Sequence, residues 1–351
     1  MSQVPVSSRG RASEVLRFIP LSLLLGSLTF ISVTGGAPRV STQQKQDQPI
    51  KLQTTLVQVP VVATDAAGGR YVTDLRKDEF EIYENGTKQE IDLFASSEIP
   101  ITVALLLDSS GSTMDQLNEI KSAALAFIDN LKPADRVMVI NFDDSVHVQC
   151  EFTSDRDILR RAVESVQPGE FTQVYEAVYT AVWERLKHVQ GRKAAIIFTD
   201  GIDTASSEID QDDTLDAIAD TEGVIVYPIR YSTRQDVERR LATRKEKAQS
   251  NGKPPQSPEE RELALDRTYQ QADEYLQQMA ELSGGVIERA DTLKDLRGAF
   301  AKIAEELRKQ YLLGYYPTDA ADDGSEREIS VRVSRPGVQI RARPAYRAPE
   351  Q

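Results

Sequence analysis

The sequence predicts an α/β fold, in which a doubly wound, mostly parallel sheet is inserted between N- and C-terminal β segments that form a small antiparallel β domain. In residues 101–309, short apolar runs typical of fully buried strands alternate with helical patterns, as in a parallel sheet covered by helices. Residues 56–94 and 310–343 instead contain alternating runs separated only by turns. The N-terminal segment has too few strands for a sandwich of its own, so we expect the two segments to pack together.

The central region begins with its most apolar strand, Ile101–Leu107, which runs directly into Asp108. Further strands are predicted at Arg136–Phe142, Ala194–Thr199 and Gly223–Ile229, with short ones at Val146–Phe152 and Gly285–Glu288. The spacing of apolar residues predicts helices at Met114–Leu131, Asp155–Val166, Val174–Lys187, Glu208–Thr221, Tyr275–Leu282 and Thr292–Lys309. Strands and helices that alternate in this way build a parallel sheet.

The flanking segments are rich in β-forming residues. At the N-terminal side, the runs Leu56–Val62 and Phe80–Tyr83 are followed by Asn85-Gly86, a strong hairpin signal, and by a returning strand at Lys88–Phe94. Asn85-Gly86-Thr87 also matches the glycosylation acceptor pattern, although the turn is the first interpretation. At the C-terminal side, strands are predicted at Gln310–Tyr316, Arg327–Val333 and Val338–Arg343.

Two parts of the chain differ from the rest in composition. Arg9, Arg11 and Arg17 precede an apolar stretch from Phe18 to Val33 and a group of small residues, which is the pattern of a secretory signal peptide. A retained membrane anchor is the alternative. Residues 233–266 are dense in mixed charge, with Asn251–Pro255 at their centre. They predict a partly helical, partly disordered insertion, either a lid over a site or a solvated excursion.

These patterns divide the chain into five parts. The predicted boundaries are 1–37 for the leader, 38–50 for a polar linker, 51–98 for the N-terminal β segment, 99–309 for the α/β domain with its charged insertion, and 310–347 for the C-terminal β segment. The leader predicts an exported protein, located in the periplasm, at the cell surface or in the medium. Contact with a membrane is expected only through residues 18–33, if they are retained.

Composition excludes several classes of function. The formal charge of −13 argues against nucleic acid as a partner. A single cysteine, Cys150, leaves no internal disulfide framework. The two histidines, His147 and His188, stand in unrelated contexts, which argues against a zinc centre or a catalytic triad built on histidine.

Polar oxygen-bearing residues follow the first buried strand. Asp108, Ser110 and Ser112 occupy alternate positions, and in an extended loop alternate side chains converge on one point. Ligands of open α/β sheets bind outside the carboxyl ends of the strands, and oxygen-only ligands suit a hard cation such as Mg²⁺. In the alternative interpretation, Asp108 and Ser109 only cap the following helix.

Two more pieces of sequence complete a known motif. Thr172 stands in the loop that precedes a helix, and Asp200-Gly201 ends the strand Ala194–Thr199. With Asp108-Ser109-Ser110-Gly111-Ser112, these residues resemble the metal-ion-dependent adhesion site of the von Willebrand factor A (VWA) domain. The resemblance covers about residues 100–309 and implies a Rossmann-like fold. It also implies that Asp108, Ser110, Ser112, Thr172 and Asp200 bind Mg²⁺, or Mn²⁺ or Ca²⁺, and that Asp108 and Asp200 lie side by side at the switch point of the sheet.

The flanks resemble a narrower group. Val72–Leu75, Asp78–Phe80 and the C-terminal strands are similar to the VWFA-related proteins known mainly from acidobacteria. One departure concerns the loop before Thr172, because the family often has two glycines where this chain has Glu170-Phe171. That difference bears on whether Thr172 reaches the metal.

The expected function is binding rather than catalysis. Neutral hydroxyls leave a bound cation under-neutralised, so it favours one more anionic oxygen, which the Asp or Glu carboxylate of a protein partner supplies. No general base accompanies the motif and no nucleophile elbow occurs in the sequence, so we expect no enzyme. Two alternatives remain open, namely a structural or assembly subunit of the cell envelope with a non-functional metal site, and a metal-dependent hydrolase.

Overall fold

The structure, a computed structural model, describes residues 55–67, 69–96, 99–234, 237–239, 257–319 and 323–349. The predicted leader, the linker and most of the charged insertion lie outside these residues. Among the helices described, none combines the length and the apolar composition that crossing a membrane requires.

The central sheet has the strand order β10-β9-β8-β5-β6-β7. Its strands are β5 (Ile101–Asp108), β6 (Arg136–Phe142), β7 (Val146–Thr153), β8 (Arg192–Thr199), β9 (Val224–Arg230) and β10 (Glu288–Arg289). All are parallel to their neighbours except β7, which runs antiparallel to β6 at the edge. Every residue of β5 and β8 is buried, as expected for strands covered on both faces.

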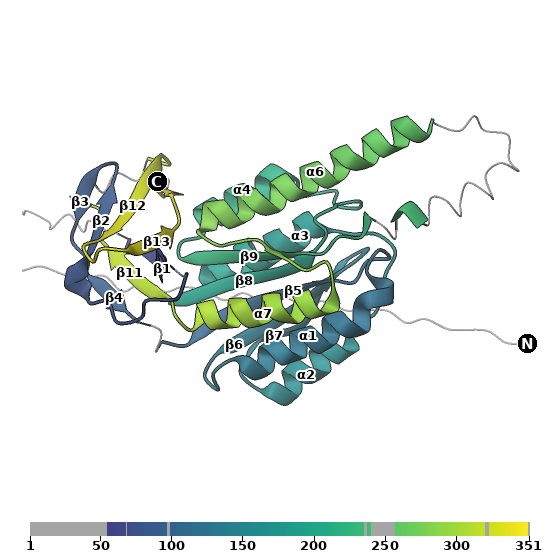
Figure 1. Cartoon of the computed structure of the whole chain (residues 1–351), viewed down its shortest axis with the longest axis horizontal. Coiled ribbons are helices and arrows are strands. Elements are labelled where there is room, and N and C mark those ends of the chain that lie inside the picture. Colours follow the sequence, from purple (N-terminus) through teal and green to yellow (C-terminus); the bar gives the residue numbers. More distant parts are fainter. Residues whose placement is uncertain are drawn as a thin grey trace, which may run out of the picture. The chain divides into compact units, whose positions relative to one another are not determined.

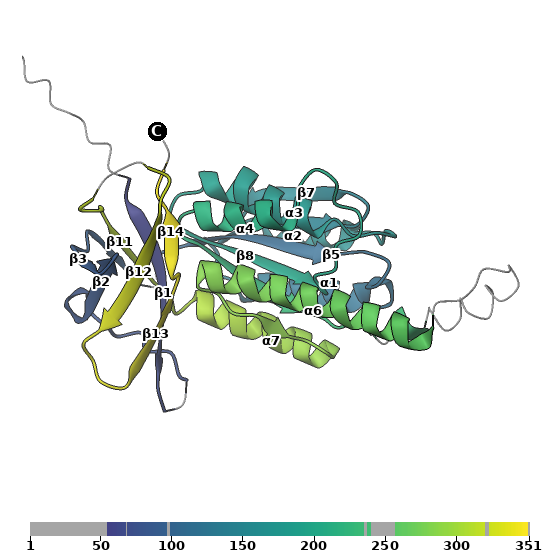
Figure 2. The ribbon, with the colours of Figure 1, turned by 90° about the horizontal axis from the view of Figure 1, so that it is seen from above.

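Helices cover both faces of this sheet (Figure 1). One face packs against α1 (Leu117–Asn130), α2 (Arg156–Ser165) and α7 (Leu293–Leu307) in one hydrophobic cluster. The other face packs against α3 (Val174–Tyr179), α4 (Gln211–Asp220) and α6 (Pro258–Ser283) in a second cluster. In the view from above, α3 and α4 are drawn towards the top of the picture and α6 and α7 towards the bottom (Figure 2). The predicted doubly wound, mostly parallel sheet is therefore confirmed.

Two helices differ from the prediction. The helix expected at Tyr275–Leu282 begins at Pro258, where Ser257 caps it by accepting from the backbone N–H of Glu260, and it ends at Gly284 in the left-handed conformation. The first turns of this helix are charged and mostly exposed. They therefore lack the apolar periodicity from which a helix is predicted. The helix after Thr172 changes to a π-helix at Thr180–Arg185 and to a 3₁₀ turn at Leu186–His188.

The flanking segments form two antiparallel sheets, ordered β13-β1-β11-β4 and β14-β12-β2-β3. Their strands are β1 (Val57–Asp65), β2 (Phe80–Glu84), β3 (Thr87–Gln89), β4 (Leu93–Ala95), β11 (Tyr311–Tyr315), β12 (Glu326–Val333), β13 (Val338–Ala342) and β14 (Ala345–Arg347). The N-terminal strand β1 pairs with β11 and β13, and β2 pairs with β12. Strands from the two ends of the chain thus pair in both sheets, alternating along the first sheet and meeting at β12 and β2 in the second. The two sheets share one hydrophobic cluster.

The prediction of one returning strand at Lys88–Phe94 is wrong. The hairpin at Asn85-Gly86 forms, but β3 stops at Gln89 and β4 belongs to the other sheet. The side chain of Ile91 is buried in the connection between β3 and β4. The alternation of apolar residues therefore continues where the chain passes from one sheet to the other, and the sequence pattern does not reveal the break. Strand β14 was not predicted.

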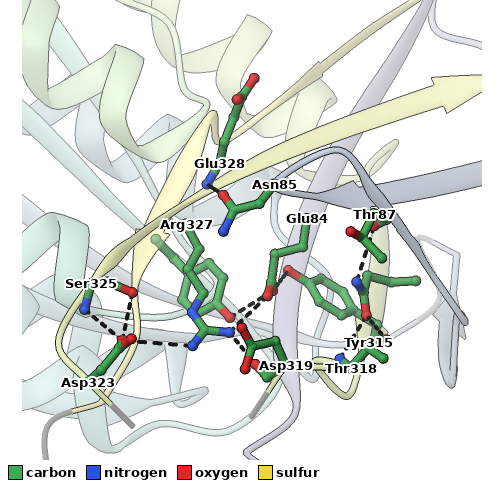
Figure 3. A network of polar contacts seen from close by, with 12 residues as sticks. Glu84, Asn85, Thr87, Tyr315, Thr318, Asp319, Asp323, Ser325, Arg327 and Glu328 are labelled. Carbon is green, nitrogen blue, oxygen red and sulfur yellow. Dashed lines mark hydrogen bonds and ion pairs between the residues drawn. The ribbon is translucent and has the colours of Figure 1, made fainter. Parts of the chain in front are cut away.

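A buried ion pair joins the two β segments (Figure 3). Glu84 on β2 and Arg327 on β12 are 3.0 Å apart, and their side chains are only 3% and 4% exposed. The phenols of Tyr315 and Tyr346 donate to Glu84 Oε2 at 2.7 and 2.8 Å. Burial, followed by the hydrogen bond to Glu84, raises the pKa of both phenols, which keeps them protonated as donors.

The β domain contacts the α/β domain at the end of the sheet opposite to Asp108. The buried guanidinium of Arg343 donates to the carbonyls of Ala219 and Thr221 at 2.6 and 3.3 Å, just before β9 begins. Arg347 pairs with Asp216 of α4 at 2.7 Å. The carboxyl ends of the parallel strands therefore lie away from the β domain.

Candidate metal centre

The loops that follow β5 and β8 lie next to each other at the same edge of the sheet. The two strands are parallel neighbours, with Leu107 opposite Phe198. The chain leaves β5 towards β6 on one side and leaves β8 towards β9 on the other. Asp108 and Asp200 therefore lie at the topological switch point, where open α/β sheets bind their ligands.

The loop after β5 groups the first three predicted residues. Asp108 Oδ2 accepts from the hydroxyl of Thr199 at 2.7 Å, and Oδ1 accepts from the N–H of Ser110 at 3.0 Å. The hydroxyls of Ser110 and Ser112 are 3.0 Å apart. Helix α1 begins only at Leu117, after a 3₁₀ turn at Met114–Gln116. Asp108 and Ser109 thus do not cap this helix, and the alternative interpretation is wrong.

The loop before Thr172 packs on the loop after β5. Gly169 donates its N–H to the carbonyl of Ser109 at 2.9 Å, and the N–H of Phe171 donates to Asp144 Oδ1 at 2.6 Å. A Cβ at position 169 would lie 2.4 Å from that of Asp143, so only glycine permits this approach. The loop is anchored in this way although Glu170-Phe171 replace the glycines of the family.

Thr172 lies between this loop and the loop after β8. It is 5% exposed, and its N–H donates to the hydroxyl of Thr204 at 2.9 Å. Its carbonyl accepts from the N–H groups of Thr204 and Ala205 at 3.0 and 3.1 Å. The backbone of Thr172 is therefore fixed to the segment that follows Asp200.

Asp200 is held by its own loop and by Thr233, and helix α6 packs against the neighbouring Gly201. Its Oδ1 accepts from the N–H of Ile202 at 3.0 Å, and its Oδ2 accepts from the hydroxyl of Thr233 at 2.5 Å. Gly201 has a φ of +79°, and a Cβ there would lie 3.0 Å from Leu276 of α6. A glycine is required by both the backbone conformation and the close helix.

The two carboxyl groups are buried close together. Burial, with a further contribution from the charge of Asp200, raises the pKa of Asp108 to about 7. Burial also raises the pKa of Asp200. Neither carboxylate forms an ion pair with a Lys, Arg or His within the described part of the chain. The charge of Arg230 lowers the pKa of Asp200 but does not outweigh burial. A cation bound between the loops would offset the remaining negative charge.

The donor set fits a hard divalent cation. Asp108 and Asp200 offer carboxylates, and Ser110, Ser112 and Thr172 offer neutral hydroxyls, all of which are oxygen donors. Over the described ranges, no group of three or more His, Cys, Asp or Glu residues could hold a metal. The candidate centre thus depends on hydroxyls for more than half of its protein ligands.

Several residues of the site were not predicted. Thr199 donates to Asp108, and Thr233 links Asp200 to the phenol of Tyr269, 2.8 Å away on α6. Thr199 precedes Asp200 and could have been found from the strand pattern. No local signal connects Thr233 or Tyr269 to Asp200, because the fold alone brings them together.

Two further side chains have structural roles. Ser109 donates to Asp143 Oδ2 at 3.1 Å and accepts from Asn141 Nδ2 at 2.9 Å, which ties the loop to β6. Asp203 accepts from the N–H groups of Tyr175 and Ser206 at 3.2 and 2.9 Å. It shapes the turn after Asp200.

Comparison with known proteins identifies the central domain. Residues 102–253 match the family model of the von Willebrand factor type A domain, and the strand order places both predicted acidic residues at one switch point. The α/β domain is therefore a von Willebrand factor type A domain. The family match covers less than half of the chain, and the nearer likeness to the VWFA-related group stays a prediction.

A curated relative shares part of this sequence. An uncharacterized protein from Synechocystis sp. is 34% identical over 107 residues, which are 29% of this chain and 26% of that protein. This chain thus matches about a quarter of the length of the Synechocystis protein.

Solved structures are similar at low identity. The vWF domain of the pilus tip protein Mfa5 from Porphyromonas gingivalis has a TM-score of 0.43 and 13% identity, with 59% of this chain and 94% of that chain covered. A von Willebrand factor type A structure from Catenulispora acidiphila has a TM-score of 0.44, 10% identity and coverage of 84% and 74%. Proximal thread matrix protein 1 from the mussel byssus, with a zinc-occupied MIDAS motif, has a TM-score of 0.44, 14% identity and coverage of 64% and 49%.

Proposed function

We propose that this chain binds a divalent cation through Asp108, Ser110, Ser112, Thr172 and Asp200, and binds an acidic group of a protein partner through that cation. The observation that supports it most is the burial of Asp108 and Asp200 beside each other without an ion-pair partner among the described residues. Two adjacent buried carboxylates without a direct ion pair are costly in a protein interior, and the charge of Arg230 opposes the burial of Asp200 only in part. Mg²⁺, Mn²⁺ or Ca²⁺ would remove that cost.

The protein's part in binding is to hold the ligands and to leave the cation accessible. Hydrogen bonds from Thr199, Ser110 and Ile202 fix the carboxylates. Because the hydroxyl ligands are neutral, the bound cation keeps a net positive charge and attracts a carboxylate from outside. An Asp or Glu of the partner supplies that group.

We propose no catalytic step at this centre. His147 is 3.3 Å from Asp143 Oδ1, and Ser109 donates to the other oxygen of the same carboxylate. The carboxylate thus stands between the hydroxyl and the imidazole, so the imidazole is not placed to take a proton from Ser109. A hydrolase would turn over generic ester or phosphate substrates, and that turnover would be lost in Asp108→Ala.

We also propose that the protein is exported. The support is the sequence pattern of residues 9–37, which has a basic start, an apolar core and small residues. N-terminal sequencing of the natural protein and cell fractionation test this. A full-length soluble protein in the cytosol would contradict it.

The test of the proposed function is a pull-down from envelope extract with wild type and Asp108→Ala side by side. We expect a partner that wild type retains in Mg²⁺, that EDTA releases and that Asp108→Ala does not retain. Retention that is equal with Mg²⁺ and with EDTA, and equal for the two proteins, would show that binding does not use this centre.

The hydrogen bond from Thr233 to Asp200 predicts an effect on metal affinity. In Thr233→Val, Asp200 loses a donor that orients it, so we expect the affinity for Mn²⁺ to fall by about 10-fold. Thr214→Val is the matched control, because Thr214 is equally buried and contacts Tyr275 of α6 at 2.8 Å, without reaching Asp200. Titration calorimetry measures both, and equal affinities in the two variants would contradict the role of Thr233.

A further inference from the structure

A cavity of about 390 Å³ lies directly beside the candidate metal centre. Its wall includes Gly201–Asp203, which follow the predicted ligand Asp200, and Tyr175, three residues after Thr172. Helix α6 forms the opposite wall between Thr268 and Gln278. The cavity is therefore lined by the loop after Asp200, by the first turn of α3 just after Thr172, and by α4 and α6. A partner seated on the cation would reach it.

The lining of this cavity is acidic and rich in amides. Its two charged side chains are the carboxylates of Asp203 and Glu274, and Gln211, Gln271 and Gln278 add amide groups. The lining contains no Lys, Arg or His. Its polar groups are therefore suited to binding a donor that carries positive charge.

Hydrogen bonding leaves part of this acidic lining open. Both oxygens of Asp203 accept from backbone N–H groups. Glu274 is exposed to solvent; its Oε1 accepts from Gln270 Nε2 at 2.8 Å, and its Oε2 has no partner within the described residues. The lining carries negative and no positive charge. In agreement with this, the charges of Asp203 and Asp210 add to burial in raising the pKa of the Tyr175 phenol. A guanidinium or ammonium group would find both an acceptor and a favourable field there.

We infer that this cavity receives a Lys or Arg side chain of the same partner whose carboxylate binds the cation. The inference rests on the proposed function and adds the class of partner, namely a segment that carries an acidic and a basic residue close together. In an extended segment each residue spans at most about 3.6 Å. Because the cavity adjoins Asp200 in sequence, we expect the two residues to be separated by about one to four positions.

The charge of the whole chain favours such a partner. At a formal net charge of −13, the chain repels a purely acidic segment at long range. A basic residue beside the acid offsets this repulsion and gives the cavity a direct part in selecting the partner.

The test uses a displayed library of random nine-residue peptides, selected on the full chain in Mg²⁺ and eluted with EDTA. We expect the eluted peptides to be enriched in an Asp or Glu with a Lys or Arg within about four residues. The same selection on Glu274→Gln should keep the acidic residue and lose the basic one. Glu281→Gln is the matched control, because Glu281 is exposed on α6, accepts from Gln277 Nε2 at 2.7 Å and does not line the cavity.

The affinities of the best peptide provide the second measurement. Replacing its basic residue by Ala should weaken binding to wild type by at least about 10-fold, as expected for loss of a charge-assisted contact. The same replacement should have little effect on binding to Glu274→Gln, because the two changes remove one interaction.

The outcomes separate this inference from the proposed function. If EDTA elutes no peptides, the proposed function fails. If the eluted peptides share an acid but no basic residue, the cavity inference is overturned and the proposed function stands. A basic preference that Glu274→Gln retains would also overturn the inference, because the basic residue would then bind elsewhere.

Discussion

Raising the pH from about 4 to about 8 is expected to destabilise the metal-free protein, and Mg²⁺ is expected to abolish most of that loss. In the folded chain the pKa of Asp108 is about 7, well above its ordinary value of 3.8. The folded state thus holds this proton where the unfolded state releases it. The free energy of folding that this proton contributes is fully present below the pKa of Asp108 in the unfolded chain. It is lost as the pH rises through the pKa of Asp108 in the folded chain. The expected loss is on the order of 4 kcal/mol.

Thermal unfolding across this pH range, in EDTA and in Mg²⁺, measures the effect. The buried Asp200, whose pKa is also raised, should act in the same direction. Asp108→Asn is the control, because it keeps an acceptor at this position and cannot ionise, so its stability in EDTA should depend much less on pH. Stability of the wild type that increases with pH in EDTA would contradict the burial of Asp108 beside Asp200.

Arg327→Met is expected to lower the free energy of unfolding by about 3–5 kcal/mol, because it leaves the carboxylate of Glu84 buried without its cation. The two side chains are 3% and 4% exposed and 3.0 Å apart. They join β2 to β12, so the substitution weakens the contact between the N- and C-terminal segments of the β domain. Urea unfolding of the two proteins measures the difference.

Arg332→Met is the matched control for this prediction. Arg332 lies on the same strand, is exposed, and stacks over the Tyr83 ring at 4.7 Å. Its loss should change stability by less than about 1 kcal/mol. Similar losses in the two variants would mean that the buried pair has no special role in joining the segments.

The central sheet could be predicted because its strands carry continuous apolar runs. Ile101–Leu107 and Ala194–Thr199 are buried on both faces, so hydrophobicity alone marks them. The polar residues that end these strands, Asp108 and Asp200, were located for the same reason. That these two residues lie close together could also be predicted, because the carboxyl ends of parallel strands meet at one edge of the sheet.

Other features needed the folded chain. Helix α6 begins at Pro258, well before its predicted start, because its first turns have a charged, exposed surface and little apolar periodicity. The hydrogen bond of Thr233 to Asp200 joins residues 33 positions apart. The split between β3 and β4 was hidden because Ile91 is buried in the crossover and continues the alternation. In each case a tertiary contact decided the outcome.

The most direct test of the central claim is titration calorimetry of Mg²⁺ and Mn²⁺ into wild type and Asp108→Ala. Asp115→Ala is the matched control, since Asp115 is exposed in the 3₁₀ turn that follows the same loop. We expect wild type and Asp115→Ala to bind one cation with similar affinity, and Asp108→Ala to lose about 100-fold or more. Equal binding by wild type and Asp108→Ala would contradict a metal centre at the ends of β5 and β8.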